Sequence, residues 1–180
     1  MLLAVYAFGP VVESQADIEV VQVAIVLNLP PDELTWYANP SSCISLANLL
    51  ELGKAPVEWH WRPSAWPVSN HVIRRPVRIW SVAGPDVAAL DALDGGGAEP
   101  LRLPDPDDAT ANDQLAVELA ASLGHLRRVE DSYWEWDWRR DHRGAGFHPE
   151  DHLWRAIHGY LDLLAAVQRS AAQQNSPRLY

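Results

Sequence analysis

The sequence predicts an α+β protein in which a mixed β-sheet domain precedes an antiparallel helical hairpin. Two apolar runs rich in Val, Ile and Tyr, at Ala4–Phe8 and Val20–Leu29, each have the length of a buried strand. Beyond residue 110 the apolar spacing changes from two to about 3.6 residues. Between these parts, residues 95–108 are rich in Gly, Pro and acids, as is typical of a linker. We therefore expect an α+β domain at 1–94, a linker at 95–109, a hairpin at 110–174 and a tail at 175–180.

Composition limits the class of protein. The chain has 180 residues and is 48% hydrophobic, which is enough for a real core and excludes global disorder. Its net charge of −10 argues against non-specific nucleic-acid binding over the whole surface. No apolar run approaches the roughly 20 residues that span a bilayer, and the apolar start at Met1–Tyr6 lacks the features of a signal peptide. The single cysteine, Cys43, fits a reducing cytoplasm, so we expect a cytoplasmic protein with no membrane partner.

The first domain has clear local signals. Gly9-Pro10 ends the first strand in a turn, and a mostly polar connection leads to the second. Residues 40–53 predict a helix, with Ser41 or Ser42 as the cap and Gly53 just past its end. Cys43 lies on the apolar face of this helix, so we expect a buried small side chain and not a nucleophile.

Two further strands and a short helix follow. Residues 57–62 alternate, with Val57, Trp59 and Trp61 on one face and a polar face opposite, formed by Glu58, His60 and Arg62. Residues 72–82 predict another strand, which Pro76 places partly at an edge or a bulge. A short helix is expected at Asp86–Asp94, ended by Gly95.

The rest of the chain predicts two helices. The first runs from about Thr110 to about His142, with Thr110 and Asp113 at its start. Its apolar stripe recurs at spacings of three and four: Leu115, Leu119, Ser122, Leu126, Val129, Tyr133 and Trp136. A loop at 143–148 turns the chain, and Pro149 starts a helix that runs to about Gln173. The stripe expected on this helix is Leu153, Ile157, Tyr160 or Leu161, Leu164 and Val167.

This order of elements resembles the nucleotidyltransferase fold of the DNA polymerase β superfamily, in its small bacterial form with C-terminal helices. In that family a strand ends in Gly-Ser, Asp-x-Asp begins a second strand, and a later strand supplies a third carboxylate. The resemblance implies that such acids hold two Mg²⁺ ions, which bind a nucleoside triphosphate and activate the acceptor oxygen. It also implies that the Gly-Ser turn and its following helix hold the phosphates through backbone N–H groups.

The chain departs from this motif at its chemical positions. Phe8-Gly9 is kept, but Pro10 stands in place of the serine. At the family spacing, Val20 and Gln22 stand where the two aspartates belong. We therefore expect a catalytically degenerate, nucleotidyltransferase-like protein without a cofactor that acts by binding. Such a protein would be a regulator or one half of a two-protein system, as in toxin–antitoxin pairs.

An active enzyme is the alternative. Asp17 and Glu19 match the acidic spelling after a shorter loop, and Glu58 would be the third carboxylate of a Mg²⁺-dependent nucleotidyltransferase. The simpler interpretation of Glu58 is a solvent-facing acid beside Arg62. The stretches VVQVAIVLNLP, HVIRRPVRIWS and PEDHLWRAIHGYLDLL also resemble a bacterial family with no assigned function.

Basic residues gather in one part of the sequence. The stretch 59–85 contains no acid, and it carries Arg62, Arg74, Arg75 and Arg78. Arginine suits phosphate and carboxylate recognition, so we expect the most positive surface here, with a nucleotide or RNA as the candidate ligand. The alternative is a solvated edge strand that resists edge-to-edge pairing.

Three weaker patterns lie in the helical part. His148 and His152 are four residues apart, but Pro149 puts His148 at the helix start, off the face of His152, which disfavours a metal site. Arg143 and His148 match the loose spacing of HEPN-type RNases, although they lie in a glycine-rich loop. The tryptophans at 134, 136, 138 and 154 cannot all share one helical face. We expect most of them in the hairpin core and one or two exposed for a protein partner.

Overall fold

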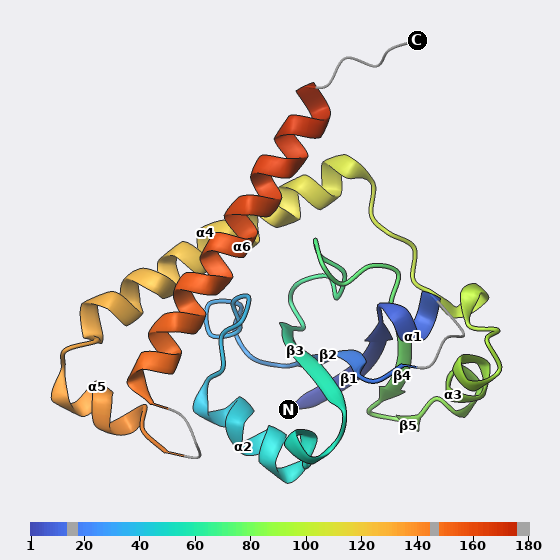
Figure 1. Ribbon diagram of the computed structural model, residues 1–180, viewed down its shortest axis with the longest axis horizontal. Coiled ribbons are helices and arrows are strands. Elements are labelled where there is room, and N and C mark those ends of the chain that lie inside the picture. Colours follow the sequence, from blue (N-terminus) through green and yellow to red (C-terminus); the bar gives the residue numbers. More distant parts are fainter. Residues whose placement is uncertain (14–17, 145–147, 176–180) are drawn as a thin grey trace.

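The computed structural model describes residues 1–13, 18–144 and 148–175, and this part of the chain contains a five-stranded mixed sheet flanked by helices (Figure 1). The sheet order is β3-β2-β1-β4-β5. The strands are β1 (Leu2–Phe8), β2 (Val21–Leu27), β3 (Val57–Pro63), β4 (Val77–Ser81) and β5 (Gly84–Pro85). The predicted α+β class is confirmed.

Strand pairing follows from the connections. β1 is antiparallel to both β2 and β4, whereas β2 and β3 are parallel. Parallel neighbours need a crossover, and here it contains α2 (Ser41–Leu49) and the 3₁₀ helix η1 (Leu52–Lys54). Pro40 is the N-cap of α2 and no side chain caps it, so the predicted serine cap is wrong. Beyond the helix, Glu51 and not Gly53 takes the left-handed backbone conformation.

One face of the sheet packs against α2. Alternation along β2 directs Val23, Ile25 and Leu27 to this face, where they meet Cys43 and Trp61. Cys43 is fully buried, as predicted, and burial raises the pKa of its thiol to about 12.

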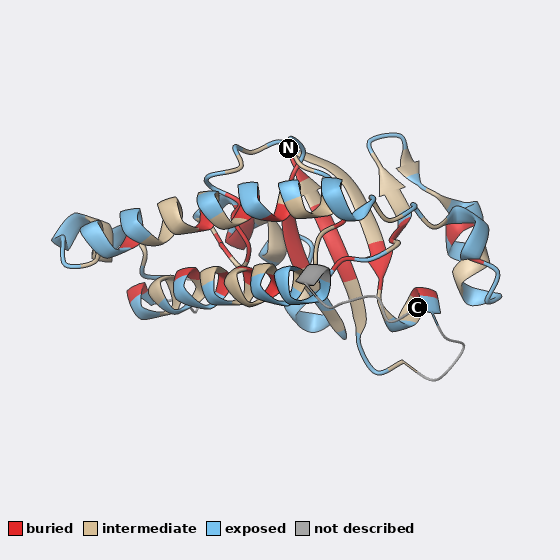
Figure 2. Cartoon of the chain, turned by 90° about the horizontal axis from the view of Figure 1, so that it is seen from above, coloured by how far each residue is buried: buried red, intermediate tan, exposed pale blue. Residues whose placement is uncertain are grey.

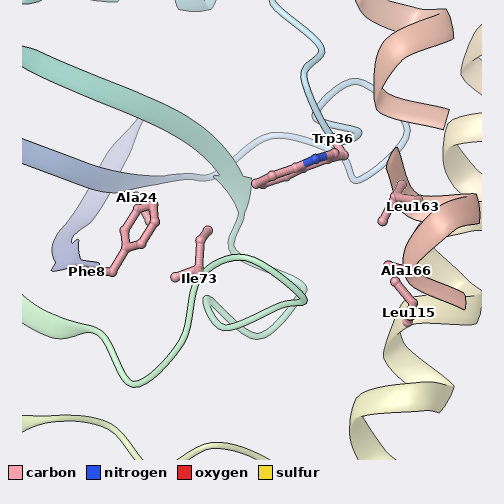
Figure 3. Packing of buried hydrophobic residues seen from close by; sticks show 7 residues of the cluster. All are labelled: Phe8, Ala24, Trp36, Ile73, Leu115, Leu163 and Ala166. Atoms are coloured by element: carbon pink, nitrogen blue, oxygen red, sulfur yellow. The ribbon is translucent and has the colours of Figure 1, made fainter. Parts of the chain in front are cut away.

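The opposite face is covered by the helical hairpin. Helices α4 (Asp108–Ser132) and α6 (Pro149–Asn175) lie side by side and run in opposite directions (Figures 1 and 2). Between sheet and hairpin lies a buried cluster, which Figure 3 shows: Phe8, Ala24, Trp36, Ile73, Leu115, Leu163 and Ala166. Because each helix is amphipathic, burying this one face on the sheet stabilises both.

The β4 side of the sheet has its own small core. Helix α1 (Pro10–Glu13) follows Gly9. Asp86 is the N-cap of α3 (Val87–Asp94), and its side chain accepts a hydrogen bond from the N–H of Ala89 at 3.1 Å. A third cluster joins these helices to the strands: Ala7, Val12, Val77, Ala89 and Ala98. Within the predicted linker, the 3₁₀ helix η2 (Glu99–Leu101) is followed by an isolated bridge between Arg102 and Val77.

Some element boundaries differ from the expectations. Of the strand predicted at 72–82 only Val77–Ser81 forms, because Arg75 has a positive φ of 42° and Pro76 cannot donate to the ladder. The first long helix ends at Ser132, and α5 (Trp136–Asp141) is a separate short helix. Asp107 caps α4, through the N–H of Thr110, in place of the predicted Thr110–Asp113 pair.

The buried face of α6 is also rotated from the predicted stripe. Ala156, Leu163 and Ala166 are buried, whereas Ile157 and Leu161 are 40% and 53% exposed. Gly159 explains the rotation, since a Cβ there would lie 2.0 Å from the carbonyl oxygen of Trp36. The helix presents its small residues because the loop backbone is this close. Among the described residues, no helix has both the length and the apolar character that crossing a bilayer requires.

Candidate functional site

Three residues of the predicted motif meet at one end of the sheet, and we call them the sheet-end site: Gly9, Gln22 and Glu58. Gln22 on β2 lies opposite Glu58 on β3, and its Nε2 donates to Glu58 Oε2 at 2.9 Å. Gly9 has a φ of +69°, and a Cβ at this position would lie 2.2 Å from Gln22 Oε1. The glycine therefore lets the turn after β1 close directly over the glutamine side chain.

Glu58 connects the sheet-end site with a buried residue of the same strand. Its side chain is half exposed, and its Oε1 lies 3.6 Å from Nε2 of His60, which is buried on the same face of β3. The His60 ring stacks on Trp36 with the centroids 4.6 Å apart and the planes 4° from parallel. Burial lowers the pKa of His60, and the nearby Glu58 carboxylate only partly offsets this effect.

Trp36 joins this stack to helix α6. Its indole Nε1 donates to Asp162 Oδ2 at 2.7 Å, and the same oxygen lies 3.0 Å from His71 Nε2. Burial alone would raise the pKa of Asp162, but the hydrogen bonds from His71 and Trp36 outweigh it and the pKa is lowered. An ionised carboxylate only accepts hydrogen bonds, so His71 Nε2 carries a proton. We call Trp36, His60, His71 and Asp162 the tryptophan–histidine cluster.

Tyr37 borders this cluster in a strained conformation. Its φ is +63°, a region that costs a residue with a side chain on the order of 1 kcal/mol. Its ring meets His60 edge-on at 5.8 Å and His158 of α6 at 4.9 Å. Burial raises the pKa of Tyr37, and the Asp162 and Glu58 carboxylates add to this shift. The surrounding rings hold the tyrosine in place despite the strain.

Two of the three residues on the polar face of β3, His60 and Arg62, are buried, which corrects the expectation for Arg62. His60 is 7% exposed and Arg62 is 1% exposed, both beneath the hairpin. Arg62 donates to the two carboxylate oxygens of Glu118 at 2.8 and 2.6 Å and to the carbonyl of Pro67 at 2.7 Å. Because Arg62 is buried and Glu118 neutralises its charge, Arg62 is not part of the predicted basic surface. A charge buried this deeply is tolerated only when it is paired.

The other predicted arginines lie at the surface. Arg74 pairs with Asp105 at 2.9 Å, and Arg75 pairs with Glu99. Arg78 is exposed on β4. Acids of the predicted linker thus neutralise two of these cations, which weakens the positive surface that the acid-free stretch indicated.

Only one of the two acids of the alternative motif lies within the described residues. Asp17 lies outside the described residues, and Glu19 is exposed in the bend before β2. Within the described ranges, no three His, Cys, Asp or Glu side chains gather as metal ligands would. At the sheet-end site, the described residues pair one amide, Gln22, with one carboxylate, Glu58.

The histidines and tryptophans noted in the helical part of the sequence lie at several different positions in the structure. His148 is exposed at the start of α6, where its backbone N–H donates to Asp151. His142 stacks on Trp138 at 4.0 Å and meets His152 edge-on. Trp134, Trp136 and Trp154 are 83%, 72% and 59% exposed, so the expectation that most of the four tryptophans lie in the hairpin core is wrong.

Sequence reasoning missed the tryptophan–histidine cluster. Trp36 lies in a loop, His71 follows a proline-rich segment, and Asp162 lies on a helix, so no spacing links the three. The one local signal was Trp36-Tyr37, an aromatic pair within the polar connection that follows the second strand.

The fold and this site define an α+β protein whose sheet carries a buried polar and aromatic cluster beneath a helical hairpin. The chain belongs to the DUF7711 family, a domain of unknown function, whose family model matches residues 1–169. No curated protein and no solved structure matches it.

Proposed function

We propose that this protein acts by binding, on a catalytically degenerate nucleotidyltransferase-like sheet. The observation that carries the proposal is the hydrogen bond from Gln22 to Glu58, at 2.9 Å, beside Gly9. The resemblance to nucleotidyltransferases assigns these three positions to the phosphate turn, a metal-binding aspartate and the third carboxylate.

The chemistry of the substituted residues supports this reading. Mg²⁺ gives up its water reluctantly and is bound through carboxylates, whereas Gln22 is neutral and Val20 is apolar. The glutamine amide also occupies one oxygen of the remaining acid, Glu58. Such a pair stabilises the pairing of β2 and β3, and it presents hydrogen-bonding groups instead of two convergent charges.

An active Mg²⁺-dependent enzyme is the second candidate. It would use Asp17, Glu19 and Glu58, and it is favoured by the half-exposed position of Glu58 at the end of the sheet. In that case the polar connection before β2 supplies two of the three ligands.

The binding partner proposed for the degenerate form is a protein, as in a regulator or a toxin–antitoxin pair. Trp134 and Trp136 support this proposal, because large exposed aromatic side chains dominate many protein interfaces. Arg78 and the partly neutralised Arg74 and Arg75 are the candidates for contact with a nucleotide or RNA. If they bind such a polyanion, its affinity falls steeply as salt rises.

A restored carboxylate tests the proposal directly. Gln22→Asp places two acids side by side, so the variant should be less stable than the wild type and regain stability on addition of Mg²⁺ or Mn²⁺. Gln22→Asn is the matched control and should not respond to metal. Thermal unfolding with and without each ion measures both effects. A wild-type protein that Mg²⁺ stabilises as strongly as it does Gln22→Asp would contradict the proposal.

A further inference from the structure

A cavity of about 500 Å³ opens between the hairpin and the loop that precedes β4, away from the sheet-end site. The first half of α4, the last third of α6 and residues 67–74 form its walls. Its volume falls within the range of small-molecule sites, roughly 300–1,000 Å³. Pro67, Leu115 and Ala166 supply an apolar wall. We call it the hairpin cavity.

The buried acid that lines this cavity is already neutralised. Glu118 and Arg62 are each 1% exposed and share two hydrogen bonds. Gln114, which also lines the cavity, donates to Glu118 at 3.1 Å. Because its charge is balanced, Glu118 does not repel an anion from the cavity.

Arg169 is the main cation of the cavity for a negative ligand. It is an exposed residue on α6, and its positive charge helps to lower the pKa of Asp162. Arg74 also lines the cavity, but it is partly neutralised by Asp105 at 2.9 Å. Asp108, at the start of α4, is a further acid of the cavity wall. Guanidinium groups bind carboxylate and phosphate through paired hydrogen bonds.

Two side chains of the cavity wall carry buried polar atoms that have no hydrogen-bond partner among the described residues. Asn70 Oδ1 accepts from the N–H groups of Val72 and Ile73, so its Nδ2 donor is turned away from them and is unpaired among the described residues. His71 is 9% exposed, and with Nε2 held by Asp162 its Nδ1 is likewise unpaired there. An unpaired buried polar group is unfavourable. A ligand whose polar group reaches these atoms would supply the missing hydrogen bonds.

We propose that the hairpin cavity binds a small organic anion. Its carboxylate or phosphate group pairs first with Arg169 and secondarily with the partly neutralised Arg74. Its apolar body lies on Pro67, Leu115 and Ala166, and a polar group on that body bonds with His71 and Asn70. This inference does not rest on the sheet-end site, so either proposal can fail alone.

Anilinonaphthalene sulfonate is a suitable probe, because it joins an anionic group to an apolar body of about this size and fluoresces when bound. Arg169→Ala removes one charge-assisted contact, so its Kd for the probe should rise about tenfold or more. Ala111→Trp fills the cavity and should abolish binding. Arg127→Ala is the matched control, an exposed arginine of α4 outside the cavity, and should leave the Kd unchanged.

Competition separates the two anion sources. Displacement of the probe by benzoate identifies a carboxylate site, and displacement by inorganic phosphate or AMP identifies a phosphate site. Because Arg169 is exposed, Arg169→Ala should fold even if Ala111→Trp does not, and circular dichroism checks both variants. A Kd in Arg169→Ala equal to that of the wild type and of Arg127→Ala would overturn the proposal.

Discussion

Arg62 and Glu118 form a buried ion pair between β3 and α4, although 56 residues separate them in the sequence. Both terminal nitrogens of the guanidinium donate to the carboxylate, at 2.8 and 2.6 Å. The pair ties the hairpin to the sheet at the boundary of the hairpin cavity.

Breaking this pair on one side should strongly destabilise the protein. Glu118→Gln leaves the Arg62 charge buried without a counter-ion, which costs about 3–5 kcal/mol. The double variant Arg62→Met/Glu118→Leu removes both charges and should recover most of that loss, because an apolar pair needs no desolvation of ions. Urea unfolding of the single and double variants measures the difference. A double variant less stable than Glu118→Gln would show that the pair itself, and not the unpaired charge, dominates.

Gly159 should be far less tolerant of alanine than Gly124. In Gly159→Ala the new Cβ meets the Trp36 carbonyl oxygen at 2.0 Å, so α6 must move away, and overpacking of this kind costs about 1–3 kcal/mol. In Gly124→Ala the nearest atom is the end of Arg128 at 3.7 Å, and removing a mid-helix glycine should stabilise α4 by about 0.5–1 kcal/mol. Thermal unfolding compares the two variants. Equal effects of the same sign would contradict the close approach of α6 to the loop.

Acid should destabilise the protein through two histidines of the hairpin. Burial lowers the pKa of His125 and of His152 from 6.5 to about 4, and neighbouring positive charges, from Arg128 and His142 among others, add to it. Between pH 6.5 and 4 the unfolded chain therefore binds protons that the folded protein excludes, so stability is full above this range and falls as the pH is lowered through it.

The measurement is Tm as a function of pH in the wild type and in His125→Gln/His152→Gln. The double variant should show a shallower loss of Tm between pH 6.5 and 4.5, since its two positions no longer titrate. A profile as steep as that of the wild type would assign the acid sensitivity to other groups.

Local patterns predicted the strands and their faces, but not what covers each face. The alternation along β3 correctly put Glu58, His60 and Arg62 together, yet it could not show that the last two are buried, because the covering Glu118 belongs to a distant helix. Burial of Cys43 was predictable, since its own helix carries the apolar face.

Tertiary contacts also override the helix signals. No Gly or Pro marks the break after Ser132, and the face of α6 follows the position of Trp36, which the α6 sequence does not encode. At the sheet-end site, the family spacing led to Gln22 and the strand alternation to Glu58. Their contact depends on the parallel pairing of β2 and β3, whose register sets Gln22 opposite Glu58 and is not encoded by either strand alone.

Label transfer from a nucleoside triphosphate tests the central claim most directly. The wild-type protein is incubated with labelled triphosphates, Mg²⁺ or Mn²⁺, and candidate protein or RNA acceptors. Val20 and Gln22 stand at the positions where the resemblance to nucleotidyltransferases expects two aspartates, so no metal-dependent transfer is expected. Transfer that is lost in Asp17→Asn and Glu19→Gln, but kept in Gln22→Ala, would contradict the account and establish the active enzyme.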